Sequence, residues 1–164
     1  MTETITTERL ELVWFSPELD EALLDGRRDE LGFAVPDDWP NEHDRRFLAF
    51  RLRQMGEEPA RGPWLVRGVV LPETRELIGH VGFHGPPGIN SLKAPDAVEI
   101  GYTIFPEHRR NGYATEAVVG LLDWARAQGI HRFTTTTAPT PRRRTSSRAT
   151  ASATVPVRLL RRQR

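Results

Sequence analysis

The segment PEHRRNGYATEA, at residues 106–117, constrains the fold of this chain more than any other. It follows AVEIGYTIF (97–105), whose β-branched and aromatic residues predict a strand, and it leads into a helical pattern over 112–128. Adjacent arginines repel each other and glycine weakens a helix, so this composition is unusual at a helix start. A bound phosphate explains both features, because a helix N-terminus presents free backbone N–H groups and the positive end of the helix dipole.

Individual residues of this segment suit a phosphate. Gly112 allows an anion to approach the backbone closely, and Ala114 keeps the next turn small. Arg109 and Arg110 supply charge and forked donors. The alternative interpretation is a solvated basic loop that caps the helix. The strand before the loop and the helix after it favour the phosphate.

Hydrophobic periodicity and turn chemistry predict the order strand–helix–helix–strand–strand–strand–helix–strand. The last strand–helix–strand unit is expected to be a right-handed crossover with parallel strands. The predicted fold class is therefore α/β (α+β), with a mixed, mostly antiparallel sheet flanked by helices. The predicted strands are 9–15, 64–71, 76–84, 97–105 and 130–137, and the predicted helices are 16–24, one that begins at Pro40, and 112–128.

Composition excludes several classes of protein. The chain has 164 residues, enough for one domain with a core, and its 38% hydrophobic and 27% charged residues are typical of globular proteins. It contains no cysteine, which excludes disulfides, thiolate metal sites and a cysteine nucleophile. No apolar run is long enough to span a bilayer, and the N-terminus does not read as a signal peptide. A cytoplasmic protein with no membrane partner is expected.

The run RRNGYA resembles the arginine/glutamine-x-x-glycine-x-glycine/alanine motif of the GNAT superfamily of acetyl-CoA-dependent N-acetyltransferases. The surrounding EIGYTIFPEHRRNGYATEAVVGLLDWA is similar to that family's central block. ERLEL near the start and DDWP before the second helix resemble the branch that includes the ribosomal-protein N-terminal acetyltransferases. The resemblance covers residues 8 to about 133 and implies the GNAT-like acyl-CoA N-acyltransferase fold, with acetyl-CoA as co-substrate and no metal.

The resemblance also implies where the cofactor binds. Backbone amides from Arg110 to Thr115 are expected to hold its pyrophosphate, and the strand around Ile104 is expected to pair with its pantetheine arm. No Walker lysine or G-x-G-x-x-G spacing is present, which disfavours a nucleotide triphosphatase or a dinucleotide enzyme. The predicted cofactor site comprises Thr103, Ile104, Phe105, Arg109, Arg110, Asn111, Gly112, Tyr113, Ala114 and Thr115.

Glu99 is the candidate catalytic base. Acetyl transfer to an amine needs a neutral nitrogen, so a base must take a proton from the amine, whose pKa is about 10.4 if it resembles lysine. Strand alternation places Glu99 with Gly101 and Thr103 on one face of an otherwise apolar strand, just before the cofactor loop. It is expected to act through a water, and related enzymes often carry a glutamate there. The alternative is a glutamate that faces solvent or pairs with an arginine.

The transition state also needs oxyanion donors, for which a backbone N–H near Ile104 or Phe105 is the candidate. His80 and His84 share one face of their strand; a metal pair is conceivable, but no third ligand is apparent. They are better interpreted as polar residues near the acceptor cleft, which His84 could line. On family grounds, Trp39 and the loop 85–96 shape the acceptor site.

The composition changes after Phe133. Residues 134–164 contain eight arginines and no acid, whereas residues 1–133 hold 15 basic residues and all 22 acids, a net charge of −7. We therefore expect a GNAT-like domain at 1–133, lacking the family's C-terminal helix and strands, and a disordered tail at 134–164. A shifted reading frame is one hypothesis for the tail, and a natural basic tail is the other.

Three functions follow from these patterns. The first is an N-acetyltransferase that moves acetyl from acetyl-CoA to a primary amine, either a protein N-terminus or a small molecule. The second is a non-catalytic acyl-CoA-binding remnant, or an inactive truncated or frameshifted product. The third is nucleic-acid binding by the arginine tail, which is disfavoured because the tail has no aromatic residue for stacking. The sequence sets neither the acceptor nor the oligomeric state.

Overall fold

A computed structural model describes residues 3–137 and 153–156, which form a single seven-stranded sheet in the order β1 to β7. Neighbouring strands are antiparallel except β5 and β6, which are parallel. This confirms the predicted mixed, mostly antiparallel sheet. The strands are β1 (Ile5–Thr6), β2 (Glu11–Trp14), β3 (Arg67–Leu71), β4 (Glu76–Phe83), β5 (Ala97–Ile104), β6 (Arg132–Thr137) and β7 (Ala153–Pro156).

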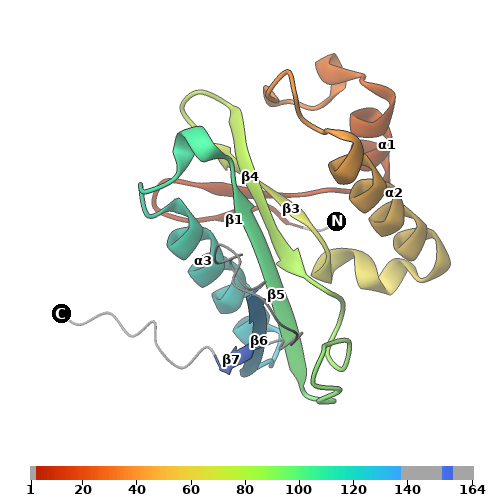
Figure 1. Ribbon diagram of the computed structural model, residues 1–164, viewed down its shortest axis with the longest axis vertical. Coiled ribbons are helices and arrows are strands. Elements are labelled where there is room, and N and C mark those ends of the chain that lie inside the picture. Colours follow the sequence, from red (N-terminus) through yellow and green to blue (C-terminus); the bar gives the residue numbers. More distant parts are fainter. Residues whose placement is uncertain (1–2, 138–152, 157–164) are drawn as a thin grey trace, which may run out of the picture.

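Helices cover both faces of the sheet (Figure 1). The helices are α1 (Pro17–Asp25), α2 (Glu42–Glu57) and α3 (Tyr113–Ala127). One core cluster joins α3 to residues such as Val98 and Ile100 of β5. A second cluster joins α1 and α2 to the opposite face through residues such as Phe15 and Leu77. β5 and β6, which α3 connects, are parallel as predicted.

The second helix begins later than predicted. It starts at Glu42 and not at Pro40, because the side chain of Asn41 accepts the backbone N–H groups of His43 at 2.9 Å and of Asp44 at 3.1 Å. Asp44 returns a bond to the N–H of Asn41, which completes a capping box. The helix start is therefore set by side-chain capping, and the proline precedes it.

Other boundaries differ for similar local reasons. The strand predicted from residue 64 begins at Arg67, because Pro59–Trp64 forms a 3₁₀ helix. A proline cannot donate to a strand ladder, and this helix contains two of them. The strand Ile5–Thr6 was not predicted, since two residues are too few to show an alternation.

The C-terminal part differs from the expected domain boundary. β6 continues past residue 133 to Thr137, and Ala153–Pro156 pairs with it in antiparallel fashion as β7. The rest of the predicted disordered tail, with its arginines, lies outside the described residues. Threonine-rich β6 therefore belongs to the sheet even though its composition resembles that of the tail.

Candidate active site

The loop between β5 and α3 has the backbone expected of an anion site. Pro106–His108 forms a short 3₁₀ turn, and Arg110 and Gly112 both adopt left-handed conformations, with φ of 65° and 79°. Gly112 is the N-cap of α3, and no described side chain caps the first amides of this helix. Those amides are therefore available to an anion, and they sit at the positive end of a helix of 15 residues.

A pocket of about 340 Å³ opens beside this loop. It brings together eight of the ten predicted cofactor residues, whereas Phe105 and Asn111 do not line it. Its lining includes Arg109 and Arg110 and no acidic residue, so its charge suits a phosphate group. The lining residues are Tyr102, Thr103, Ile104, His108, Arg109, Arg110, Gly112, Tyr113, Ala114 and Thr115.

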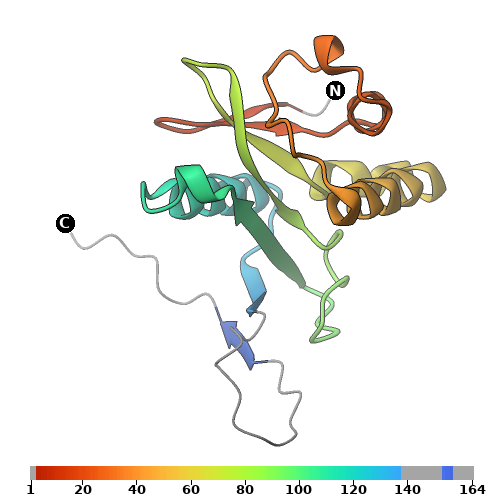
Figure 2. The same cartoon turned by 45° about the horizontal axis from the view of Figure 1, so that its top comes forward.

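The second half of β5 has an edge that β6 does not cover. The pairing of β5 with β6 ends at Ile100 and Thr135, whereas β5 continues to Ile104. Figure 2 shows β6 beside the first part of β5 only. An extended ligand can pair with such an edge as an additional strand would.

Alternation decides which backbone groups face this edge. Phe105 donates its N–H to Ile78 at 2.8 Å, and the carbonyl of Glu99 accepts from His84 at 2.8 Å, so the odd-numbered residues of this segment face β4. Because backbone groups alternate along a strand, those of Tyr102 and Ile104 face the open edge. The Phe105 N–H is thus already used, and its ring packs on Trp39, with centroids 5.7 Å apart.

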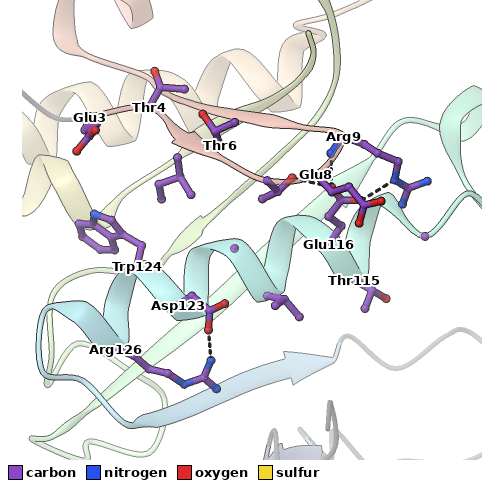
Figure 3. Close-up of a pocket in the computed structure, with 15 residues that line it drawn as sticks. Glu3, Thr4, Thr6, Glu8, Arg9, Thr115, Glu116, Asp123, Trp124 and Arg126 are labelled. Carbon is purple, nitrogen blue, oxygen red and sulfur yellow. Dashed lines mark hydrogen bonds and ion pairs between the residues drawn. The ribbon is translucent and has the colours of Figure 1, made fainter. Parts of the chain in front are cut away.

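Residues near the N-terminus hold the loop between β5 and α3, the candidate phosphate loop, in place. Arg9 donates from Nη1 to the carbonyl of Asn111 at 3.0 Å and from Nε to Glu116 at 2.7 Å (Figure 3). Its guanidinium also lies 4.8 Å from the centre of the Tyr113 ring. Thr7 donates to the same carboxylate at 2.6 Å. Sequence reasoning missed this support, because Arg9 and Glu116 lie far apart in the chain and no spacing connects them.

Glu116 places a negative charge at the helix N-terminus that would hold a phosphate. Burial alone would raise its pKa, but hydrogen bonds from Thr7 and Arg9 hold the pKa of Glu116 below its ordinary value. Arg9 therefore offsets a carboxylate that would otherwise oppose an anion at the same place. The bonds also fix the first turn of α3 against the segment that leads into β2.

A larger groove of about 1240 Å³ lies between residues 3–9 and α3 (Figure 3). It shares Gly112 and Thr115 with the smaller pocket. Its acidic lining, Glu3, Glu8, Glu116 and Asp123, is poorly suited to a phosphate, and Arg9 and Arg126 are paired with two of these acids. We therefore place the anion site in the smaller pocket.

Glu99 lies in the interior of the protein. Its side chain is 2% exposed, and the backbone N–H of Ser91 donates to its Oε2 at 2.6 Å. His84 Nδ1 lies 3.4 Å from the same oxygen. Of the two alternatives from the sequence, a solvent-facing glutamate is wrong, since the carboxylate is buried beside a histidine and a loop amide.

The loop between β4 and β5 is ordered around Asn90. The side chain of Asn90 donates to the carbonyls of Ala94 at 2.8 Å and Ala97 at 2.9 Å, and it accepts the N–H of Ala94 at 3.0 Å. These bonds hold the neighbouring Ser91 amide where it meets the Glu99 carboxylate. The side chain of Asn90 therefore acts on Glu99 indirectly, by positioning the Ser91 amide.

His80 and Trp39 both pack against aromatic side chains. The His80 ring stacks on Phe47 of α2, with centroids 5.6 Å apart, and burial lowers the pKa of His80 to about 4. Trp39, expected to shape the acceptor site, is only 6% exposed and packs in the core between Phe15 and Phe105. Within the described part of the chain, no group of three or more potential metal ligands occurs.

An acidic and a basic side chain, Asp20 and Arg51, are buried under α1 and α2. Asp20 of α1 is fully buried, and its carboxylate oxygens have no hydrogen-bond partner among the described residues. Burial raises the pKa of Asp20 to about 8, although Arg51 opposes this shift. Arg51 of α2 donates from Nη1 to the carbonyl of His84 at 3.1 Å. The buried pair is thereby linked to the backbone of the candidate site.

The mixed sheet flanked by helices matches the acyl-CoA N-acyltransferase fold. The sequence matches the acetyltransferase (GNAT) domain family over residues 9–148, and the chain belongs to that family. The match extends past residue 133, where composition had suggested that the domain ends. Within the described residues, no helix has the length and apolar character needed to cross a membrane.

Relatives with known sequences agree with this assignment. The chain is 31% identical over 99 residues to the uncharacterized N-acetyltransferase YjdG of Bacillus subtilis, covering 58% of this chain and 54% of that protein. It is 38% identical over 67 residues to the uncharacterized N-acetyltransferase YoaA of the same organism, covering 40% of this chain and 35% of that protein. The chain thus matches about half or less of the length of these relatives.

Solved structures share the fold. A GNAT-family acetyltransferase from Bacillus anthracis has a TM-score of 0.52 at 24% identity, covering 84% of this chain and 75% of that one. A putative ribosomal-protein-serine acetyltransferase from Vibrio cholerae has a TM-score of 0.54 at 20% identity, covering 85% and 77%. A ribosomal L7/L12 acetyltransferase in complex with coenzyme A has a TM-score of 0.50 at 20% identity, covering 82% and 74%.

Proposed function

We propose that this protein is an N-acetyltransferase that transfers acetyl from acetyl-CoA to a primary amine. The observation that carries the proposal is one juxtaposition. The uncapped N-terminus of α3, with left-handed Gly112, lies beside the open edge of β5, and the same strand carries the buried carboxylate of Glu99. An anion site, a strand edge and a base are the three elements that this reaction requires.

The cofactor is bound by groups at two places. The amides of residues 110–115 and the guanidinium groups of Arg109 and Arg110 hold the pyrophosphate. The outward backbone groups of Tyr102 and Ile104 pair with the pantetheine arm. Arg109 also donates from Nε to the carbonyl of Ile104 at 2.8 Å, which joins the phosphate loop to the open edge. Bound acetyl-CoA supplies an acetyl group activated as a thioester.

The oxyanion donor is the N–H of Tyr102. The N–H of Phe105 is bonded to Ile78, which removes one of the two donors expected from the sequence. Ile104 faces the open edge, but it is five residues from Glu99, about 16 Å along an extended strand. Tyr102 is three residues away, about 10 Å, and therefore lies closer to the groups that handle the proton. Glu99 supplies the buried carboxylate of these groups, and the amine approaches from the side of the sheet that α2 covers.

The acceptor class is a primary amine, either a protein N-terminus or a small molecule. Among the structural neighbours are proteins described as ribosomal-protein acetyltransferases, which supports a protein α-amine as one candidate. The acidic residues around the domain, with a net charge of −7 over residues 1–133, favour a cationic acceptor.

Calorimetric titration with acetyl-CoA tests the cofactor site. We expect micromolar binding by the wild type and a loss of at least about 30-fold in Gly112→Glu, which adds a carboxylate at the phosphate position. Gly129→Glu is the matched control, because Gly129 has a similar left-handed φ of 85° at the other end of α3 and has open space around it. Equal losses in both variants would show backbone strain only and would count against the site.

Turnover is tested separately with a panel of amines. The panel contains peptides with free N-termini, polyamines and aminoglycosides, with release of free thiol as the signal. Acetylation of at least one class, lost in Gly112→Glu, supports the proposal. Tight acetyl-CoA binding with no acetylated amine would favour a non-catalytic acyl-CoA-binding protein.

A further inference from the structure

We propose that His84, and not Glu99 itself, takes the proton from the acceptor amine, with Glu99 as the carboxylate that positions the imidazole. The inference rests on the proposed acetyltransferase function and assigns the group that touches the acceptor. The observation behind it is that a buried carboxylate lies against an exposed imidazole at the end of β4.

Glu99 and His84 differ in how far their side chains are exposed to solvent. The side chain of Glu99 is 2% exposed, whereas that of His84 is 44% exposed. The Oε2 atom of Glu99 already receives the Ser91 amide at 2.6 Å and has His84 Nδ1 at 3.4 Å. A carboxylate in this position orients the imidazole, and hydrogen bonds of this kind are often long without substrate and shorten in the reactive complex. The imidazole is the member of the pair that a substrate can reach.

The imidazole extends from Glu99 toward the assigned oxyanion donor. A Cβ atom placed on Gly101 would lie 3.4 Å from His84 Nε2, so this nitrogen sits over a residue that has no side chain. Gly101 directly precedes Tyr102, whose N–H we assign to the oxyanion. The imidazole thus lies between the Glu99 carboxylate and the residue before Tyr102. Glu99 alone would need intervening water to reach the same place.

The backbone of His84 is fixed from both sides. Its N–H donates to the carbonyl of Glu99 at 2.8 Å, and its carbonyl accepts from Arg51 Nη1 at 3.1 Å. Arg51 also donates to the side chain of Gln54 at 2.8 Å. The main chain from which the imidazole extends is therefore held in place. The charged and titratable groups nearest to it are Glu99 on β5 and Arg51 on α2, with Asp20 of α1 next to Arg51 and His80 on its own strand.

The proton inventory balances without another reactant. With Nδ1–H donated to Glu99, the lone pair on Nε2 takes one proton from the ammonium form of the acceptor. The freed amine electron pair forms the C–N bond as the C–S bond breaks, with its electron pair remaining on sulfur. The second amine proton, lost as the amide forms, ends on the thiolate. The proton on His84 passes to solvent, to which the imidazole is exposed.

Nuclear magnetic resonance of the imidazole tests the arrangement without any turnover. Long-range ¹H–¹⁵N correlation spectra of the whole chain report which ring nitrogen of each of the five histidines carries the proton. His84→Gln identifies the His84 signals. We expect the neutral His84 ring to be protonated on Nδ1, and Glu99→Gln to abolish this preference. A ring protonated on Nε2 would overturn the proposal, since that nitrogen could not then accept a proton.

Kinetics test the proton transfer. We expect His84→Gln to lower kcat by about 100-fold, within the usual range for a general base, with acetyl-CoA affinity changed by less than about twofold. The loss should be smaller for an amine of low pKa, which is already neutral. His131→Gln, at an exposed histidine, is the control and should retain wild-type rates. A His84→Gln rate within about threefold of wild type, or an equal loss for both amines, would overturn the role.

Gly101→Ala adds a second test that spares the histidine. The new methyl group would meet Nε2 at 3.4 Å, an ordinary contact, so the fold should tolerate it while the approach to Nε2 narrows. We expect kcat to fall about tenfold with cofactor binding unchanged. Gly56→Ala, with no atom within 4 Å of the new methyl, is the control. If the wild type acetylates no amine, the proposed function fails, whereas the tautomer measurement still decides the pairing of His84 with Glu99.

Discussion

Arg9 donates to Glu116 across 2.7 Å and so joins the segment that leads into β2 to the first turn of α3. The same guanidinium holds the carbonyl of Asn111 in the phosphate loop. One side chain thus fixes the shape of the anion site and also offsets the single carboxylate in its first helical turn. Arg9 is also the first residue of the segment that matches the family.

Arg9→Ala should weaken acetyl-CoA binding about tenfold, because Glu116 then presents an unpaired charge at the N-terminus of α3. Adding Glu116→Gln should recover part of the loss, since the double variant has neither charge. Calorimetric titration of the wild type, both single variants and the double variant with acetyl-CoA gives the coupling free energy between Arg9 and Glu116. Strictly additive losses would contradict the compensation and leave Arg9 with a structural role only.

Asn90→Ala should lower the acetyl-transfer rate about tenfold and leave acetyl-CoA affinity unchanged. The reason is that Asn90 orders the loop whose Ser91 amide meets Glu99. Ser91→Ala is the matched control and should have little effect, because Ser91 contributes its backbone N–H. Steady-state kinetics at varied acceptor concentration measure the transfer rates of both variants. A larger loss in Ser91→Ala than in Asn90→Ala would be incompatible with this explanation.

The free energy of unfolding of the Asp20→Asn variant should increase relative to that of the wild type as pH rises. The pKa of Asp20 is about 8 in the folded protein and 3.8 in its ordinary state, so the unfolded chain releases the proton first. The protonated carboxyl of Asp20 contributes its full stabilisation below about pH 4, and this contribution is lost as pH rises to about 8. We expect the difference in unfolding free energy to shift by about 4 kcal/mol between pH 5 and pH 8.

Chemical denaturation of both proteins at several pH values measures this difference, and other titrating groups largely cancel in the comparison. The opposite sign, with Asp20→Asn losing stability relative to wild type as pH rises, would mean that Arg51 keeps Asp20 ionised. The buried pair would then be an ion pair and not a neutral acid beside a guanidinium.

Gly79→Ala should destabilise the fold by about 3 kcal/mol or more, because the new methyl would lie 2.1 Å from the backbone oxygen of Thr103. A backbone atom in a strand cannot move aside without separating β4 from β5. Gly56→Ala, in open space on α2, should leave stability unchanged or raise it slightly. Thermal unfolding of both variants is the measurement, and a stable Gly79→Ala protein would show that β4 and β5 can shift past each other.

Much of the architecture could be predicted from local patterns. The strand at 97–104 and the helix after it were recognised because alternation and helical periodicity are visible within a few residues. Gly112 was predicted from the close approach that a phosphate needs, and the structure adds that it has a left-handed φ of 79°. The boundaries at Pro40 and residue 64 were missed because capping by Asn41 and the turn at 59–64 compete with the broader pattern.

Contacts between distant segments could not be predicted in this way. On family grounds Trp39 was expected at the acceptor site, but its aromatic partners Phe15 and Phe105 come from segments far apart in the chain, and burial against them decided its place. Likewise, the loop amide of Ser91 and the imidazole of His84 meet Glu99 only after β4 and β5 pair.

By itself, the sequence determined the element order, the phosphate loop and the candidate glutamate, because each depends on neighbours within one turn or one strand. The tertiary structure decided which backbone groups of β5 remain open, since that depends on where β6 stops pairing with it. It also decided that Glu99 is buried behind His84, and that Arg9 supports the phosphate loop. Burial and charge pairing are properties of surfaces brought together by folding, and no local pattern encodes them.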